Sequence, residues 1–261
     1  MGKLLLFNLG IIVVIMLVLF VCKRYVKDDR SKNRVLLFSS VITIFVHYSS
    51  FIYYCFVGDA VVLSYLKNNP NLILPIYPCN VVMWSALIFG LIKNKESKVK
   101  KFLADYLFWF GIFSTLVGMF ANVDFIMNPT LKDYEVTKSI LAHATLLFNV
   151  LLIYVFGYIK LNFINNMKHI LISIGLMFVI GVYCNLIFMV LVSVEEAHNI
   201  NSMFILHSPF SSVPFLIYPV IALVALILYS VLLTMLEIFN YSREERWYNN
   251  LKLFNRTRLK D

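Results

Sequence analysis

The chain has 261 residues, of which 61% are hydrophobic and only 14% are charged. Soluble domains are about 45–50% apolar and about 25% charged, so this composition excludes a soluble globular protein and requires lipid around the chain. The net charge of +9 would suit a nucleic-acid partner only if the basic residues gathered on one soluble face. They alternate with hydrophobic runs instead, so we expect membrane lipids and no nucleic acid as partners.

Seven apolar runs reach the length of about 18 residues that a membrane-spanning helix needs. The sequence therefore predicts an all-α, polytopic membrane protein with transmembrane helices at 4–22, 35–57, 71–93, 102–121, 137–160, 169–194 and 213–238. We expect a seven-helix bundle over residues 1–241 and a basic cytoplasmic tail over residues 242–261. The tail is either an amphipathic helix on the membrane surface or a plain stop-transfer flank.

The basic residues predict how the bundle is oriented. The segments 23–34, 93–101, 160–168 and the tail from 243 hold 6, 5, 2 and 6 Lys or Arg. The alternate segments hold only Lys3, Lys67, Lys132 and Lys138. Because cytoplasmic loops are enriched in Lys and Arg, we expect the N-terminus outside and the C-terminus in the cytoplasm.

Few ionisable or metal-binding side chains lie inside the expected spans. Asp105 and Glu237 fall near the cytoplasmic ends, where Lys101 and Arg243 are their expected partners. The four cysteines have neither the pairing of a disulfide framework nor the spacing of a metal site, so we expect no metal and no cofactor.

The third expected span contains the stretch Leu74-Pro75-Ile76-Tyr77-Pro78-Cys79-Asn80. Each proline removes an intrahelical hydrogen bond, so we expect a broken helix here. If the helix restarts with Pro78 at its first position, Cys79 and Asn80 lie in its first turn, where the helix dipole favours a thiolate or an oxyanion. The alternative is a simple kink beside an inert buried cysteine.

His143 lies at a similar expected depth in the fifth span. At about 1.5 Å per residue, Cys79 lies about 21 Å above Lys93, and His143 about 25 Å above Lys160. A cysteine and a histidine in one layer are suited to act as nucleophile and base. A lone intramembrane histidine can equally hydrogen-bond a neighbouring helix.

Further polar residues are expected in the same outer layer. Asn201 and His207 belong to a polar, proline-containing segment before the seventh span, and Asn185 lies near the outer end of the sixth. His47 falls nearer the middle of the membrane. A pocket, if present, is expected to open outward.

Four segments of the sequence resemble the YwaF-like integral membrane proteins of bacteria, which are related to eukaryotic transmembrane acyltransferases. Leu74-Pro75…Cys79-Asn80 resembles the family's Leu-Pro-Leu-His-x-Cys-Asp/Asn motif, with Tyr77 where the family has His. The remaining matches are Tyr106-Leu107-Phe108-Trp109 with Gly111, the intramembrane His143, and Asn201-Ser202-Met203-Phe204 with Pro209.

The resemblance implies a lipid acyltransferase or transacylase in the plasma membrane of a bacterial cell. Cys79 would be the nucleophile and His143 the acid–base residue, with Asn201 orienting His143. The expected substrate-binding or oxyanion residues are Asn80, Asn201, Tyr77, Trp109, Asn185 and His207.

A non-catalytic transporter of small solutes or lipids is the alternative, since broken helices near the midplane are common in transporters. Against it, the sequence shows no inverted repeat. The sequence leaves the substrate and the oligomeric state open.

Overall fold

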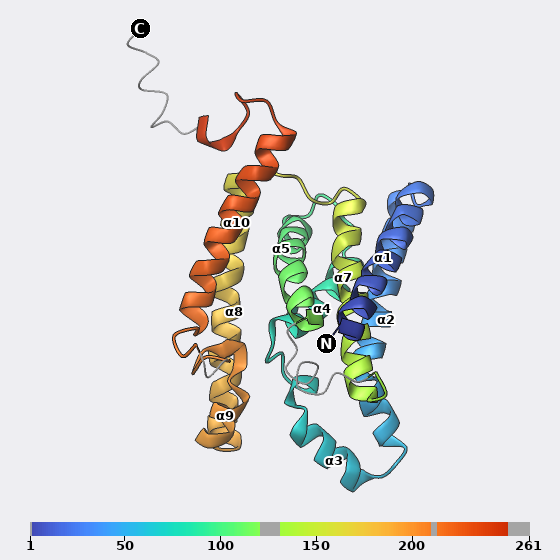
Figure 1. Ribbon diagram of the computed structural model, residues 1–261, viewed down its shortest axis with the longest axis vertical. Coiled ribbons are helices and arrows are strands. Elements are labelled where there is room, and N and C mark those ends of the chain that lie inside the picture. The colour runs from blue at the N-terminus through green and yellow to red at the C-terminus, as the bar shows by residue number, and fades with distance from the viewer. Residues whose placement is uncertain (1, 121–130, 210–212, 250–261) are drawn as a thin grey trace. The chain divides into compact units, whose positions relative to one another are not determined.

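The computed structural model describes residues 2–120, 131–209 and 213–249, with side chains from residue 5 onward, and their regular structure is entirely helical. The α-helices are α1 (Gly2–Tyr25), α2 (Asp29–Cys55), α3 (Asp59–Asn68), α4 (Pro78–Leu91), α5 (Lys98–Phe120), α7 (Tyr134–Val155), α8 (Phe163–Leu191), α9 (Val194–Ile200) and α10 (Tyr218–Asn240). Short 3₁₀ turns η1, η2 and η3 cover Pro70–Leu72, Ser202–Phe204 and Trp247–Asn249. The α-helices are labelled in Figure 1.

The chain forms two compact units, residues 1–159 and 160–261. The boundary expected at residue 241 stays a prediction.

Six helices are long and apolar enough to cross a membrane: α1, α2, α5, α7, α8 and α10. They correspond to six of the seven expected spans. The third expected span, 71–93, differs because only its second half is a continuous helix, the 14-residue α4. At about 1.5 Å per residue this helix is about 21 Å long, which is shorter than the hydrocarbon core of about 30 Å.

Helix α7 is central to the first unit, where it packs against α5, α2, α1 and α4 (Figure 1). Buried polar side chains add to this packing. Asn149 of α7 donates to Thr43 Oγ1 of α2 at 2.8 Å and accepts from Ser39. Asn8 of α1 donates to the Met119 carbonyl of α5 at 2.7 Å. Such bonds between helices fix their register in lipid, where water cannot replace a lost partner.

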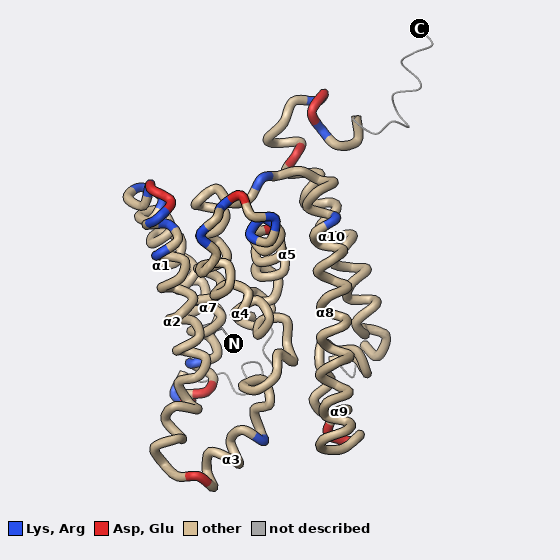
Figure 2. The backbone as a smooth tube through the Cα atoms, turned by 180° about the vertical axis from the view of Figure 1, so that it is seen from behind, with Lys and Arg blue, Asp and Glu red and all other residues tan. Residues whose placement is uncertain are grey.

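Most basic residues of the first unit gather at one end, where α1 ends, α2 begins and α4 leads into α5 (Figure 2). We call this the basic end. Lys100 is fully buried there, and its ammonium group donates to Asn33 Oδ1 at 2.8 Å and to the Ile92 carbonyl at 2.6 Å. Because Ile92 caps the C-terminus of α4, Lys100 complements the negative end of that helix dipole.

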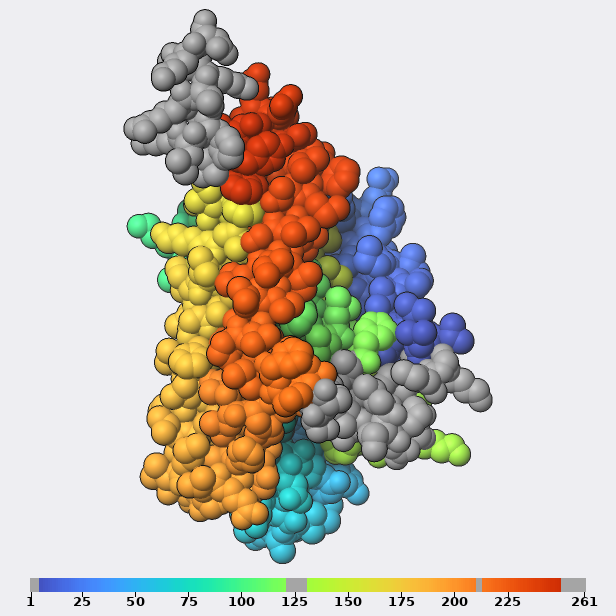
Figure 3. All heavy atoms as spheres, turned by 60° about the vertical axis from the view of Figure 1, so that its left-hand side comes forward, coloured from blue at the N-terminus to red at the C-terminus, as the bar shows by residue number. Residues whose placement is uncertain are grey.

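In the second unit, α8 and α10 pack against each other. The surface of α10, orange to red in Figure 3, exposes large apolar side chains along its whole length, and we expect these side chains to contact lipid acyl chains. They are Leu223, Val224, Ile227, Leu228, Val231, Leu232, Met235, Ile238 and Phe239.

Glu237 joins three elements of the second unit at the end of α10. Its carboxylate accepts the backbone N–H of Phe163, which begins α8, at 2.6 Å, and that of Trp247, which begins η3, at 2.9 Å. The expected pairing with Arg243 is therefore wrong, because helix and turn N-termini supply the donors that balance this buried carboxylate. Lys101 pairs with Glu96, and the expected Asp105–Lys101 pair stays a prediction.

The described part of the tail, residues 242–249, folds back against the end of α10. Arg246 donates to the Tyr241 carbonyl at 3.2 Å and to the Ile238 carbonyl at 3.0 Å, which satisfies the last turn of the helix. This stretch is a turn followed by η3, so no amphipathic α-helix begins here. Residues 250–261, including Arg256 and Arg258 of the expected surface helix, lie outside the described residues.

Replacing Lys100 with alanine should destabilise the first unit. The change leaves the Ile92 carbonyl and the Asn33 amide oxygen without their charged donor, which should lower the free energy of unfolding by about 2–4 kcal/mol. Thermal unfolding in detergent measures the effect. Lys101→Ala is the matched control, because its exposed pair with Glu96 should contribute less than about 1 kcal/mol. Equal melting temperatures for the two variants would contradict this role of Lys100.

Candidate functional site

Helix α4 begins at Pro78, directly after a stretch of non-helical backbone. Tyr77 is the N-cap residue, with extended backbone angles (φ −117°, ψ 152°), and Pro78 occupies the first helical position. The expected break and restart are confirmed. Cys79 and Asn80 therefore lie in the first turn of α4, with Cys79 half-buried and Asn80 buried.

The backbone around this break is satisfied by two side chains. Asn80 Oδ1 accepts the Tyr77 N–H at 3.2 Å, and the Tyr48 hydroxyl of α2 donates to the Leu72 carbonyl at 2.9 Å. Asn80 thus caps its own helix through its oxygen. The Asn80 amide nitrogen carries two hydrogen-bond donors and is separate from the oxygen that caps the helix.

His143 packs against α5 at a glycine. Its Nδ1 lies 2.7 Å from the Ser139 carbonyl, and a Cβ added at Gly118 would lie 2.1 Å from its Nε2. Only Gly118 allows the ring to lie this close to the backbone of α5. Because a carbonyl oxygen can only accept, Nδ1 carries the proton and the neutral ring presents Nε2 as its basic nitrogen.

Cys79 and His143 belong to the same unit but do not hydrogen-bond each other. Val82 of α4 and Val150 of α7 both lie against Gly111 of α5, since a Cβ at Gly111 would contact each of them. The two valines therefore mark one common level along the bundle. His143 lies seven residues before Val150 on α7, about 10 Å along the helix, and Cys79 lies three residues before Val82 on α4, about 4.5 Å. The two residues are thus offset by about 6 Å along the bundle.

Tyr77 and Trp109 occupy different positions relative to Cys79. Tyr77 immediately precedes α4 and is 37% exposed, so it can contact a ligand that approaches Cys79. Trp109 is buried on α5, two residues from Gly111, and its ring packs edge-on against Phe108 with centroids 4.9 Å apart. It forms part of the packed core on the side of Cys79 that faces the basic end.

Sequence reasoning gave no role to two residues of α2, His47 and Ser50. His47 Nε2 and Ser50 Oγ are both buried and have no hydrogen-bond partner among the described residues. The i,i+3 spacing of His47 and Ser50 was the available signal, but their neighbours depend on how α2 packs, which the sequence does not specify.

Asn185, Asn201 and His207 lie in the second unit, where they organise one tight turn. Asn185 of α8 accepts the Ser202 N–H at 2.9 Å and donates to the Ser202 carbonyl at 3.3 Å. This pairing holds backbone that adopts positive φ at Asn201, Met203 and Phe204 (φ 45°, 54° and 56°), a conformation that is rare for residues with side chains. A Cβ at Gly181 would lie 2.8 Å from Met203, so Gly181 makes room for the turn on α8.

The Asn201 side chain is engaged within its own loop. Its Nδ2 donates to the His207 carbonyl at 2.7 Å, and its Oδ1 accepts the Leu206 N–H at 2.9 Å. These bonds explain the asparagine at this position as a structural residue. The expected orientation of His143 by Asn201 has no support in the contacts of either residue.

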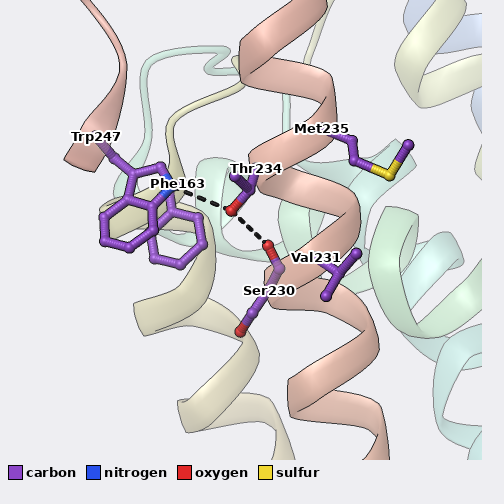
Figure 4. A pocket seen from close by; sticks show the side chains of 6 residues that line it. All are labelled: Phe163, Ser230, Val231, Thr234, Met235 and Trp247. Atoms are coloured by element: carbon purple, nitrogen blue, oxygen red, sulfur yellow. Dashed lines mark hydrogen bonds between the residues drawn. The ribbon is translucent and has the colours of Figure 1, made fainter. Parts of the chain in front are cut away.

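The second unit also has an open, mostly apolar hollow of about 450 Å³, drawn in Figure 4. Trp247 stacks on Phe163 with centroids 4.2 Å apart, and its indole N–H donates to Thr234 Oγ1 at 3.1 Å. The remaining lining residues are Ser230, Val231 and Met235.

The fold and these contacts define a multi-pass α-helical membrane protein that contacts membrane lipids and carries a thiol and an imidazole between its helices. Residues 2–237 match the model of the TMEM164 family, and the chain belongs to this family. Searches of curated proteins and of solved structures each found no significant match.

Replacing Gly118 with alanine should displace His143. The added methyl group overlaps the ring, so we expect a loss of about 1–3 kcal/mol in unfolding free energy, measured by thermal unfolding in detergent. Gly10→Ala is the matched control, because nothing lies within 4 Å of a Cβ there and alanine favours the helix. Combining Gly118→Ala with His143→Ala should cost less than the sum of the single changes. Additive losses would show that the ring does not lie on Gly118.

Replacing Asn185 with alanine should loosen the turn at 201–207. Both backbone groups of Ser202 lose their partner, which should destabilise this region by about 1–3 kcal/mol. Hydrogen exchange should become faster at the Ser202 amide and its neighbours and stay unchanged in α4 and α7. Unchanged exchange at Ser202 would contradict the pairing.

Proposed function

We propose that the protein is an integral membrane lipid acyltransferase, acting as a transacylase, with Cys79 as nucleophile and His143 as acid–base residue. The observation that carries the proposal is the position of Cys79 in the first turn of a helix restarted by Pro78. The positive end of the α4 dipole favours the thiolate there. The resemblance of this segment to the YwaF-like proteins and the related acyltransferases supports the same chemistry.

The first half of the reaction forms a thioester on Cys79. His143 Nε2 accepts the thiol proton through a bridging water or substrate oxygen, and the thiolate attacks the ester carbonyl of a donor lipid. The Cys79 backbone N–H and the Asn80 amide nitrogen are proposed to stabilise the oxyanion. When the C–O bond breaks, the imidazolium returns its proton to the leaving oxygen, and a lipid with a free hydroxyl group departs.

The second half transfers the acyl group to another lipid. A hydroxyl group of the acceptor attacks the thioester carbonyl, the C–S bond breaks, and the acceptor's proton ends on the departing thiolate. Cys79 is thereby restored as a thiol. Tyr77 is proposed to contact the substrate, and the roles of Trp109, Asn185, Asn201 and His207 in substrate binding stay predictions.

We place this chemistry in the outer half of the plasma membrane of a bacterial cell. With α4 and its preceding segment counted as a seventh crossing, the basic end faces the cytoplasm, the N-terminus lies outside and the C-terminus inside. Cys79 and His143 then both lie in the half of the first unit away from the basic end.

Replacing Cys79 or His143 with alanine should reduce acyl transfer by at least about 100-fold, because each change removes a reacting group. The assay uses purified protein in vesicles with a donor lipid carrying an isotope-labelled acyl chain and an acceptor lipid carrying a free hydroxyl. Cys22→Ala is the matched control, since it removes another half-buried thiol at the basic end.

Transfer that continues in Cys79→Ala would overturn the proposal. Solute or lipid movement across the vesicle membrane, with no acyl exchange in the wild-type protein, would favour the transporter, which the broken backbone before α4 also suits.

A further inference from the structure

The basic end of the first unit carries a large excess of positive charge. The segments that meet there, residues 23–34 and 93–101, hold 11 Lys or Arg and three acidic residues, which leaves a net charge of +8. The whole chain has a net charge of +9. The rest of the sequence is therefore close to neutral, and the excess charge belongs to this end.

Two lysines of the basic end lie against one tyrosine ring. Lys95 Nζ and Lys100 Nζ are 5.6 Å and 5.0 Å from the centroid of the Tyr158 ring. The Tyr158 hydroxyl donates to Asn33 Oδ1 at 3.0 Å, and Lys100 donates to the same oxygen at 2.8 Å. These contacts bring together the start of α2, the loop between α4 and α5, the start of α5 and the residues that follow α7. We call Lys32, Lys95, Lys100 and Tyr158 the lysine cluster.

Lys32 joins the cluster through Asp29. Asp29 Oδ1 lies 3.8 Å from Lys32 Nζ and 3.5 Å from Lys95 Nζ, and the Asp29 side chain is 59% exposed. Exposed ion pairs contribute less than about 1 kcal/mol. Another anion can therefore replace Asp29 beside these two ammonium groups at a small cost in free energy.

The negative groups around the lysine cluster do not balance its charge. Asp29 contributes one negative charge. Lys100 donates to the Ile92 carbonyl at 2.6 Å and Lys32 to the Phe156 carbonyl at 3.5 Å, and these carbonyls cap the C-termini of α4 and α7. Each helix C-terminus acts as about half a negative charge. The three ammonium groups thus face about two negative charges, which leaves about one positive charge unbalanced.

The lysine cluster lies at the level where phospholipid head groups surround a membrane protein. Helix α2 begins at Asp29, α5 begins at Lys98 and α7 ends at Val155, and all three are long and apolar enough to cross a membrane. The ends of spanning helices reach the head-group layer, where basic pockets between helices bind anionic head groups. A phosphodiester carries one negative charge, which matches the charge left unbalanced in the cluster.

We propose that the lysine cluster binds the phosphate group of an anionic phospholipid. Lys32 and Lys95, whose side chains are 19% and 41% exposed, bind the phosphate oxygens in place of Asp29. Lys100 is buried and adds its charge without direct contact. The site is independent of the proposed acyl transfer, because it uses none of the residues assigned to that reaction.

The test measures lipid binding to the purified full-length protein in an uncharged detergent. Phosphatidylglycerol has an anionic head group, whereas the head group of phosphatidylcholine has no net charge. Each lipid is titrated while the melting temperature is followed, since a lipid that binds only the folded protein raises it. We expect phosphatidylglycerol to act at concentrations at least about 10-fold lower than phosphatidylcholine.

Lys95→Gln and Lys32→Gln should each weaken phosphatidylglycerol binding by about fivefold, because each removes an ammonium group that contacts the phosphate. Lys98→Gln is the matched control. It removes the same charge from the same end but takes part in none of the contacts of the cluster, so binding should change less than about twofold. Two variants at separate positions keep the test decisive if one of them unfolds.

Asp29→Asn should have the opposite effect and strengthen phosphatidylglycerol binding by about two- to fivefold, because it removes the competing carboxylate. A purely structural role of Asp29 in the first turn of α2 predicts a lower melting temperature with unchanged lipid binding. That outcome would contradict the exchange of Asp29 for phosphate.

Equal binding of the two lipids, or equal weakening by Lys95→Gln and Lys98→Gln, would overturn the site. Inorganic phosphate is the last arm of the experiment. If it raises the melting temperature as much as phosphatidylglycerol does at the same concentration, the ligand is free phosphate and the lipid proposal is wrong.

Discussion

Two prolines, Pro75 and Pro78, determine the geometry on which the site depends. Backbone groups within a lipid bilayer must be hydrogen-bonded inside the protein, and proline removes donors that a continuous helix would use. The chain satisfies the break through the Tyr48 hydroxyl and the Asn80 side chain. The helix that restarts is consequently short, and it presents Cys79 in its first turn instead of in the middle of a span.

The surrounding helices hold this turn in place through close contacts at glycine. Gly111 lets Val82 of α4 and Val150 of α7 meet at α5, and Gly118 accepts the ring of His143. Since α7 is also bonded to α2 through Asn149, the imidazole has little freedom to move along the bundle. The site thus depends on interhelical packing, which a residue distant from Cys79 can disturb.

The sequence predicted what local chemistry specifies. Apolar runs located the six long helices, and the spacing of Pro78 and Cys79 predicted the helix restart. It could not predict lateral neighbours, because an asparagine or histidine in a span has several possible partners. Asn201 was expected to orient His143, yet its side-chain amide forms hydrogen bonds within its own loop. Glu237 was assigned a charged partner, yet backbone N–H groups bind it.

The most direct test of the central claim is the chemical state of Cys79 in protein purified with its native lipids. Mass spectrometry of the peptide that contains Cys79 should detect an acyl chain in thioester linkage, removable by neutral hydroxylamine. The same chain should be absent from the other three cysteines. A Cys79 that stays a free thiol while the protein exchanges acyl chains between lipids would contradict the account.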